Sequence, residues 1–185
     1  MSTESEDLKT AKIMGGVGTI VRGIGEILVL IGIKKIADIA KRKEIFSHYV
    51  TSFVLELLLF PLIFVFQVIA SFSKTTGRLE VIHFFIDRVG IVGFILFVIF
   101  IPYTMFVIAS YFKKKSFVAI ANTFGVKSFE EAGNLWFLGS ILLIVFGLGA
   151  IVLLVAWIYT IIAFFSLPEE VPSIRNTENL PINSN

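Results

Sequence analysis

Residues Leu135 to Leu167 have the sequence LWFLGSILLIVFGLGAIVLLVAWIYTIIAFFSL, which is 33 residues long and carries no charge. Eighteen or more apolar residues in a row predict a helix that spans a membrane. Lipid offers no hydrogen-bond partners, and a helix satisfies its backbone N–H and C=O groups internally. This stretch therefore predicts an integral membrane protein of the all-α class.

The composition of the whole chain agrees with this prediction. Of its 185 residues, 56% are hydrophobic and 16% are charged, and the mean hydropathy is +0.91. Soluble domains have about 25% charged residues. The composition therefore excludes an ordinary soluble fold, and we expect the lipid bilayer of the cell membrane to surround this chain.

Several classes of function are disfavoured by what the sequence lacks. The net charge of +2 is small and scattered, so no nucleic-acid partner is expected. The chain has no cysteine, which removes disulfides and thiolate chemistry. His48 and His83 stand apart from carboxylate clusters and predict no metal site. No Ser, His and acid grouping predicts hydrolysis, so we expect no enzyme activity and no cofactor.

The hydrophobic segments predict one helical domain, 13–167, between a disordered head, 1–12, and a disordered tail, 168–185. Each segment is long enough to cross about 30 Å of hydrocarbon. The fold predicted from them is a bundle of four spans, at about 13–33, 49–72, 89–112 and 135–167.

The last predicted span is longer than a bilayer requires. Thirty-three helical residues extend about 50 Å. We therefore predict one long helix bent at Gly147 and Gly149, because the surrounding residues include no polar turn former. A hairpin of two shorter helices is the alternative.

Basic residues predict the orientation of the bundle. Loops 34–48 and 113–134 hold nine Lys and Arg residues, whereas the head, the middle connection and the tail together hold six. The excess of positive charge on cytoplasmic loops then places these two loops in the cytoplasm and both termini outside. A hairpin at the C-terminal end would move the tail to the cytoplasmic side.

Local patterns predict details of the two basic loops. Asp38 and Arg42 are spaced to pair along a helix that continues from the first span. Gly125 suits the left-handed residue that ends a helix. Ser128 and Glu131 form a capping box, which predicts the start of the next helix.

Small residues line the first predicted span. Gly18, Gly25 and Gly32 recur every seven residues, and Gly15 begins a second, four-residue pattern. Such residues let neighbouring helix backbones approach closely, so these four glycines predict helix-packing surfaces. A flexible or pore-lining helix is the alternative interpretation.

Four polar residues lie inside the predicted spans, where charges are costly: Arg22, Glu26, Glu56 and Gln67. Arg22 and Glu26 are four residues apart and can pair, and antiparallel packing brings Glu56 to the depth of Glu26. The excess negative charge then needs a proton, a cation or a lysine such as Lys34. The cluster either fixes the helix register or binds a proton or small cation in a transport path.

Two stretches of the chain, Leu28 to Phe53 and Tyr111 to Pro168, resemble the prokaryotic membrane protein family catalogued as domain of unknown function 996. The elements T-x-G-V-K-x-F, A-G-x-L and AFFSLP occur in order in the second stretch. The resemblance implies a multi-pass membrane protein and supplies no activity. The matched positions include Lys115, Ser116, Gly125, Val126, Lys127, Phe129, Ala132, Gly133, Gly139, Ala156, Trp157, Ala163, Phe164, Phe165 and Ser166.

Two functional hypotheses remain. The first is a non-enzymatic structural or assembly component of the membrane that packs with itself or with another membrane protein. The second is a small proton- or cation-coupled transporter or channel that uses Arg22, Glu26 and Glu56.

Overall fold

The computed structural model describes residues 3–21, 25–76, 90, 93, 99–145 and 147–169, with side chains given except at 60, 62, 63 and 65–76. These parts of the chain are helical, which confirms the all-α class. The helices are α1 (Thr3–Ile20), α2 (Gly25–Ile39), α3 (Lys43–Thr76), α5 (Ile101–Phe124), α6 (Lys127–Leu142) and α7 (Leu148–Phe165).

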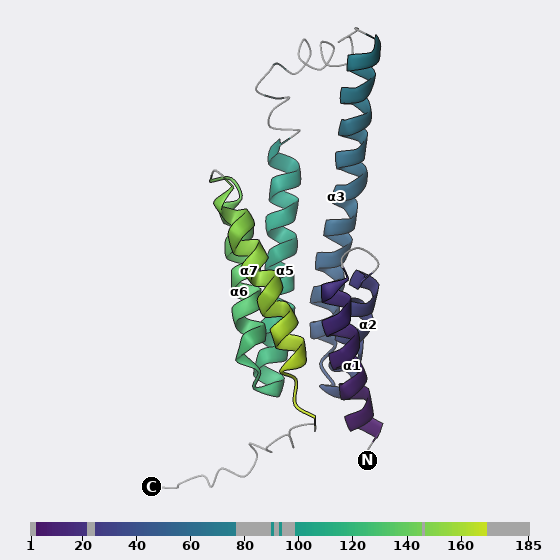
Figure 1. Cartoon of the computed structure of the whole chain (residues 1–185), viewed down its shortest axis with the longest axis vertical. Helices are drawn as coiled ribbons and strands as arrows, with labels where there is room; N and C mark the ends of the chain where they lie inside the picture. The colour runs from purple at the N-terminus through teal and green to yellow at the C-terminus, as the bar shows by residue number, and fades with distance from the viewer. Residues whose placement is uncertain are drawn as a thin grey trace, which may run out of the picture.

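Two long helices carry two helical hairpins. Helices α3 and α5 lie side by side, with the α1–α2 hairpin packed along α3 and the α6–α7 hairpin packed along α5 (Figure 1). The hairpins meet where α1 contacts α7. The start of α1, the two connections 40–42 and 125–126, and residues 166–167 after α7 share one end of the bundle, which we call the basal end (Figure 1). At this end Lys12 Nζ donates a hydrogen bond to the carbonyl oxygen of Leu167, at 3.2 Å.

The predicted first span, 13–33, is wrong as a single helix. Helix α1 ends at Ile20 and α2 begins at Gly25, and the two helices pack against each other. Gly18 and Gly25 meet at the top of this hairpin, where a Cβ on Gly25 would overlap the carbonyl oxygen of Gly18. The glycines therefore serve contact within one hairpin. The predicted disordered head is also wrong for residues 3–12, which belong to α1.

The predicted long bent helix at 135–167 is wrong as well, and the hairpin alternative is correct. Helices α6 and α7 run antiparallel, joined by a turn in which Gly147 has a φ of 76°. Val145 N–H donates to Leu142 O at 2.9 Å, and Leu148 N–H donates to Val145 O at 3.0 Å. These bonds satisfy two backbone N–H groups of the turn without a polar side chain.

The connection between α5 and α6 follows the sequence prediction in part. Gly125 has a φ of 72° and its N–H bonds to Ala121 O, which confirms the left-handed helix end. The predicted capping box is wrong, because α6 begins at Lys127 after the extended residue Val126 and has no side-chain cap. Glu131 instead lies 3.9 Å from Lys127 Nζ, an ion pair one turn apart.

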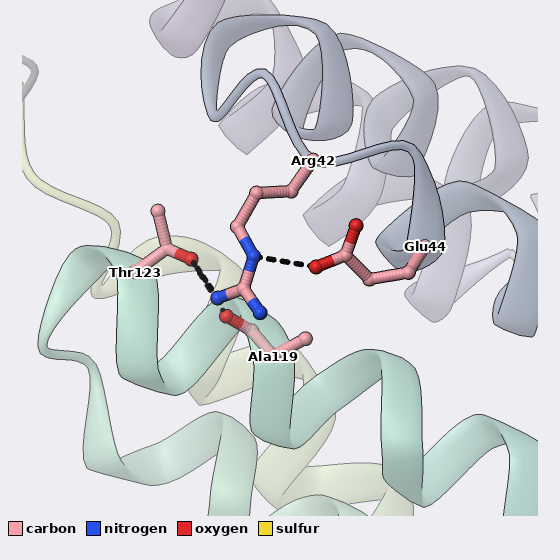
Figure 2. Close-up of polar contacts among 4 residues, drawn as sticks. All are labelled: Arg42, Glu44, Ala119 and Thr123. Atoms are coloured by element: carbon pink, nitrogen blue, oxygen red, sulfur yellow. Dashed lines mark hydrogen bonds and ion pairs between the residues drawn. The ribbon is translucent and has the colours of Figure 1, made fainter.

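The connection between α2 and α3 is fixed by Arg42. Arg42 pairs with Glu44 and not with the predicted Asp38: its Nε donates to Glu44 Oε1 at 2.7 Å. Its Nη1 donates to Thr123 Oγ1 of α5 at 3.1 Å (Figure 2). Thr123 in turn donates to Ala119 O. The backbone N–H of Glu44 and the Arg42 guanidinium lower the pKa of the Glu44 carboxyl. Arg42 thus connects the α2–α3 turn to α5.

The core lies in the basal half of the bundle. The rings of Phe117, Phe129 and Phe164 pack edge to face, with centroids 5.5 Å apart for the first pair and 5.1 Å for the second. They join α5, α6 and α7 and are almost wholly buried. The Phe164 ring also covers Gly15, so the core includes α1.

Exposed apolar side chains and charged side chains separate along the bundle. Of the charged residues whose side chains the structure describes, those of α1 to α6 lie toward the basal end, apart from Glu26, Glu56 and Lys113. Exposed apolar residues occupy the remaining length and also the length of α7. They include Ile13, Val17 and Ile20 on α1, Ile27 and Ile31 on α2, Val54, Leu57 and Leu58 on α3, Ile101 and Ile108 on α5, Leu138 and Ile141 on α6, and Ile151, Leu154 and Ile158 on α7.

Among the described residues, one helix is long and apolar enough to cross a membrane. This is α7, whose 18 residues have a mean hydropathy of 2.5 and are 28% buried inside the bundle. The four predicted spans therefore reduce to one helix that meets this criterion within the described part of the chain.

Candidate functional site

A polar cavity of about 50 Å³ lies where the two hairpins meet the long helices. Every described helix contributes to its wall, which brings charged, hydroxyl and indole groups together inside an otherwise apolar bundle. The lining residues are Gly18, Thr19, Glu26, Val29, Tyr49, Lys113, Phe117, Trp136, Trp157 and Thr160.

The Lys113 side chain is buried at this cavity, with 5% of its surface exposed. Its Nζ lies 2.8 Å from Glu56 Oε1, which also accepts a hydrogen bond from Ser52 Oγ at 3.2 Å. The same ammonium lies over the Trp136 ring, 4.5 Å from the centroid, and 5.9 Å from the Tyr49 centroid. An ion pair and two aromatic faces therefore offset the cost of burying this charge.

Glu26 lines the cavity itself, whereas Glu56 contacts the lining residue Lys113. Glu26 Oε2 accepts a hydrogen bond from the Tyr49 hydroxyl at 3.2 Å. The charge of Lys113 interacts with both Glu26 and Glu56. Among the described residues, the site thus combines two carboxylates with one ammonium.

Hydrogen bonds from both indoles hold the cavity wall. Trp136 Nε1–H donates to Thr160 Oγ1 at 3.0 Å, which connects α6 to α7. Trp157 Nε1–H donates to the carbonyl oxygen of Thr19 at 2.7 Å, which connects α7 to the end of α1. Because each ring is bonded at its edge, its orientation is fixed.

Of the four residues in the predicted polar cluster, the structure describes the side chains of two. Glu56 pairs with the ammonium of Lys113, and Glu26 accepts a hydrogen bond from Tyr49, whose ring lies beside the same ammonium. Lys34 is exposed on α2. Arg22 lies outside the described residues. Gln67 belongs to α3, and its side chain is not among those described.

The four glycines predicted to pack helices lie in or beside the α1–α2 hairpin contact. Gly18 faces Gly25, and Gly15 lies beneath the Phe164 ring. A Cβ on Gly32 would lie 3.0 Å from Ala11 O and from Gly15 N, at the crossing of α1 and α2. A larger side chain at any of these positions would meet a packed neighbour.

Sequence reasoning missed the central residue of the site, Lys113. In the run Lys113 to Lys115 it resembles a loop residue, and we expected this segment to be a basic cytoplasmic loop. The helical phase carries the missing signal: Ala109, Ser110 and Phe117, which are three or four residues away, are all buried on the same face of α5. Tyr49, Trp136 and Trp157 resemble interfacial aromatic residues in the sequence, and their contacts with the cavity depend on tertiary packing.

The chemistry available here is recognition of charge. Within the described part of the chain, no group of three or more His, Cys, Asp or Glu side chains could hold a metal ion. His48 packs against the Phe112 ring, with centroids 5.9 Å apart, and does not line the cavity. His83 lies outside the described residues.

Comparison with known proteins places the chain in a family. The family model described as a protein of unknown function, DUF996, matches residues 21–158. The uncharacterized protein MJ1644 of Methanocaldococcus jannaschii is 36% identical over 184 residues, which cover 90% of this chain and 97% of that protein. No solved structure matches the chain. The chain therefore belongs to the DUF996 family.

Proposed function

We propose that this chain is an integral membrane protein without enzymatic activity, which acts by packing with a second copy of itself or with another membrane protein. The observation that carries this proposal is the outward apolar surface combined with a buried ion pair. Soluble proteins rarely expose apolar patches larger than a few hundred Å². In lipid the same surface needs no cover, and charges turn inward to find partners.

The lengths of the helices suggest how the bundle lies in the bilayer. Helix α3 has 34 residues and extends about 51 Å, more than the roughly 30 Å hydrocarbon core requires. Helix α7 has 18 residues and extends about 27 Å. In the proposed arrangement α3 crosses the membrane, while both hairpins enter from the basal end and return to it.

In this arrangement the two ends of the described chain lie on the same side of the membrane. The basal end carries the described parts of both basic loops, the start of α1 and residues 166–169 after α7. If the excess of positive charge marks the cytoplasm, all of these lie in the cytoplasm. The sequence-based expectation of two external termini followed from four spans, so it does not carry over to two hairpins.

Cysteine labelling tests this topology, because the natural chain contains no cysteine. Single variants Lys9→Cys, Lys41→Cys and Glu169→Cys should all react with a membrane-impermeant maleimide from the same side of oriented vesicles. Val145→Cys, in the α6–α7 turn, should react only with a lipid-soluble maleimide. Labelling of Lys9→Cys and Lys41→Cys from opposite sides would refute the re-entrant first hairpin.

Membrane integration and assembly need separate measurements. Wild-type protein should stay in the membrane pellet after alkaline carbonate extraction, because its apolar surface is in contact with lipid. Release into the supernatant would refute membrane integration. In mild detergent the protein should elute as an oligomer or with a partner, and a monodisperse monomer would argue against the assembly role.

A second candidate function is proton- or cation-coupled transport. The polar cavity favours it, because Glu26, Glu56 and Lys113 supply titratable groups inside an apolar bundle. Reconstituted wild type should then show proton or monovalent-cation flux that Glu56→Gln abolishes at matched folded yield. Glu44→Gln, at an exposed carboxylate of the basal end, is the matched control. Equal flux in wild type and Glu56→Gln would exclude this use of the site.

A further inference from the structure

We propose that Lys114 and Lys115, together with the rings of Tyr111 and Phe137, bind the negatively charged headgroup of a phospholipid in the membrane leaflet at the basal end. This inference rests on the proposed membrane integration and deepens it, because it names a lipid class and the residues that recognise it. Carbonate extraction tests integration and lipid retention tests the site, so the two can fail separately.

The two lysines lie over a pair of neighbouring rings between α5 and α6. Lys115 Nζ lies 4.9 Å from the Tyr111 centroid, and Lys114 Nζ lies 5.3 Å from the Phe137 centroid. The two ring centroids are themselves 5.9 Å apart. A Cβ on Gly133 would lie 3.1 Å from Lys114 Cα, so α5 and α6 are in close contact at this point. Two adjacent helices thus place two ammonium groups on one aromatic patch.

Neither of these lysines is paired with a carboxylate among the described residues. Lys113, the first of the run, is buried and contacts Glu56, whereas Lys114 is half-buried and Lys115 is exposed. The ion pairs within the described part of the chain use other basic side chains, those of Lys35, Arg42, Lys113 and Lys127. Because the aromatic rings carry no net charge, both ammonium groups keep their attraction for an anion.

The patch lies at the level where exposed side chains change from apolar to polar. Lys114 and Lys115 follow Tyr111 by about one turn toward the basal end. In a bilayer this level is the depth of the lipid headgroups, where aromatic rings and lysine ammonium groups are favoured. On five helices the exposed large apolar or aromatic side chain nearest the basal end is Ile13 (α1), Ile31 (α2), Val54 (α3), Tyr111 (α5) and Leu138 (α6).

Apolar side chains continue from the patch away from the basal end. Ile108, Tyr111 and Lys115 share one face of α5, because they are three and four residues apart. On α6, Leu138 and Ile141 are exposed beyond Phe137. A phospholipid would place its phosphate at the lysines and its acyl chains along these apolar side chains. An anionic headgroup is preferred over a zwitterionic one, because two ammonium groups repel the positive charge of choline.

Native mass spectrometry of purified full-length protein in mild detergent measures this preference. The protein is supplied with equal amounts of phosphatidylglycerol and phosphatidylcholine that carry identical acyl chains. Wild type should retain phosphatidylglycerol about tenfold more tightly, because each lysine near the membrane surface attracts the anionic lipid. An excess of inorganic phosphate should not displace the lipid, because free phosphate has no acyl chains to contact the apolar side chains.

Variants connect the preference to the two lysines. Lys114→Gln combined with Lys115→Gln removes both charges and should abolish the preference for phosphatidylglycerol. Lys114→Arg combined with Lys115→Arg keeps both charges and should retain it. Lys34→Gln combined with Lys43→Gln is the matched control, because it removes two charges at exposed positions of α2 and α3 and should bind as the wild type does. Thermal unfolding checks that each variant is folded.

Three results would overturn the proposal. These are equal retention of the two lipids by wild type, an unchanged preference in the folded Lys114→Gln, Lys115→Gln variant, and an equal loss in the Lys34→Gln, Lys43→Gln control. Displacement of the lipid by inorganic phosphate would identify a site for free anions in its place. A wild-type protein that resists carbonate extraction but retains both lipids equally would keep the proposed membrane integration and remove only the lipid site.

Discussion

Replacing Lys113 with methionine should lower the free energy of unfolding by about 3–5 kcal/mol. Methionine keeps the length of the side chain and removes the charge, so Glu56 would remain near the cavity without its 2.8 Å ammonium partner. Removing one member of a buried pair leaves an uncompensated charge, which costs more than the pair contributes. Thermal or denaturant unfolding of purified protein in detergent measures the change.

The same lysine run provides a control. Lys115 is exposed, two residues along α5, so Lys115→Met should change the free energy of unfolding by less than about 0.5 kcal/mol. Adding Glu56→Gln to Lys113→Met should restore much of the loss, because the unpaired carboxylate is then gone. A Lys113→Met protein as stable as the wild type would show that this ion pair does not stabilise the bundle.

The contrast between Lys113 and Lys115 shows what the sequence could not reveal. In the sequence the three lysines are equivalent, and the basic run marks the end of the apolar segment before it. Only the rotation of α5 against α3 and α6 turns Lys113 inward to Glu56. The acids, by contrast, were found from sequence, because Glu26 and Glu56 lie alone among apolar residues, where any charge is conspicuous.

Both errors in the predicted helices have one cause. Counting apolar residues shows that a segment is hydrophobic but not whether it reverses direction. Each of the segments 13–33 and 135–167 contains two helices that pack against each other, α1 with α2 and α6 with α7. The all-helical class was predictable from hydropathy, and the helix end at Gly125 from its glycine. The hairpins depend on contacts between glycines distant in sequence, as between Gly139 and Gly149.

The contact between Gly18 and Gly25 leads to the second large expected effect. Gly25→Leu should prevent the α1–α2 hairpin from closing, because its first added atom would overlap the carbonyl oxygen of Gly18. Overpacking typically costs about 1–3 kcal/mol where side chains can shift, and we expect at least the upper end here because backbone must move. The loss of free energy of unfolding, together with faster proteolysis of the α1–α2 segment, measures the effect.

A leucine at an exposed position of α7 provides the control for this test. Gly25 is the first residue of α2, where helix propensity contributes little, so a loss there must come from packing. Ala150→Leu adds a leucine at an exposed position of α7, where no buried neighbour is displaced, and should leave stability almost unchanged. If Gly25→Leu and Ala150→Leu were equally stable and equally resistant to protease, the close approach of α1 and α2 would not be what holds Glu26 at the cavity.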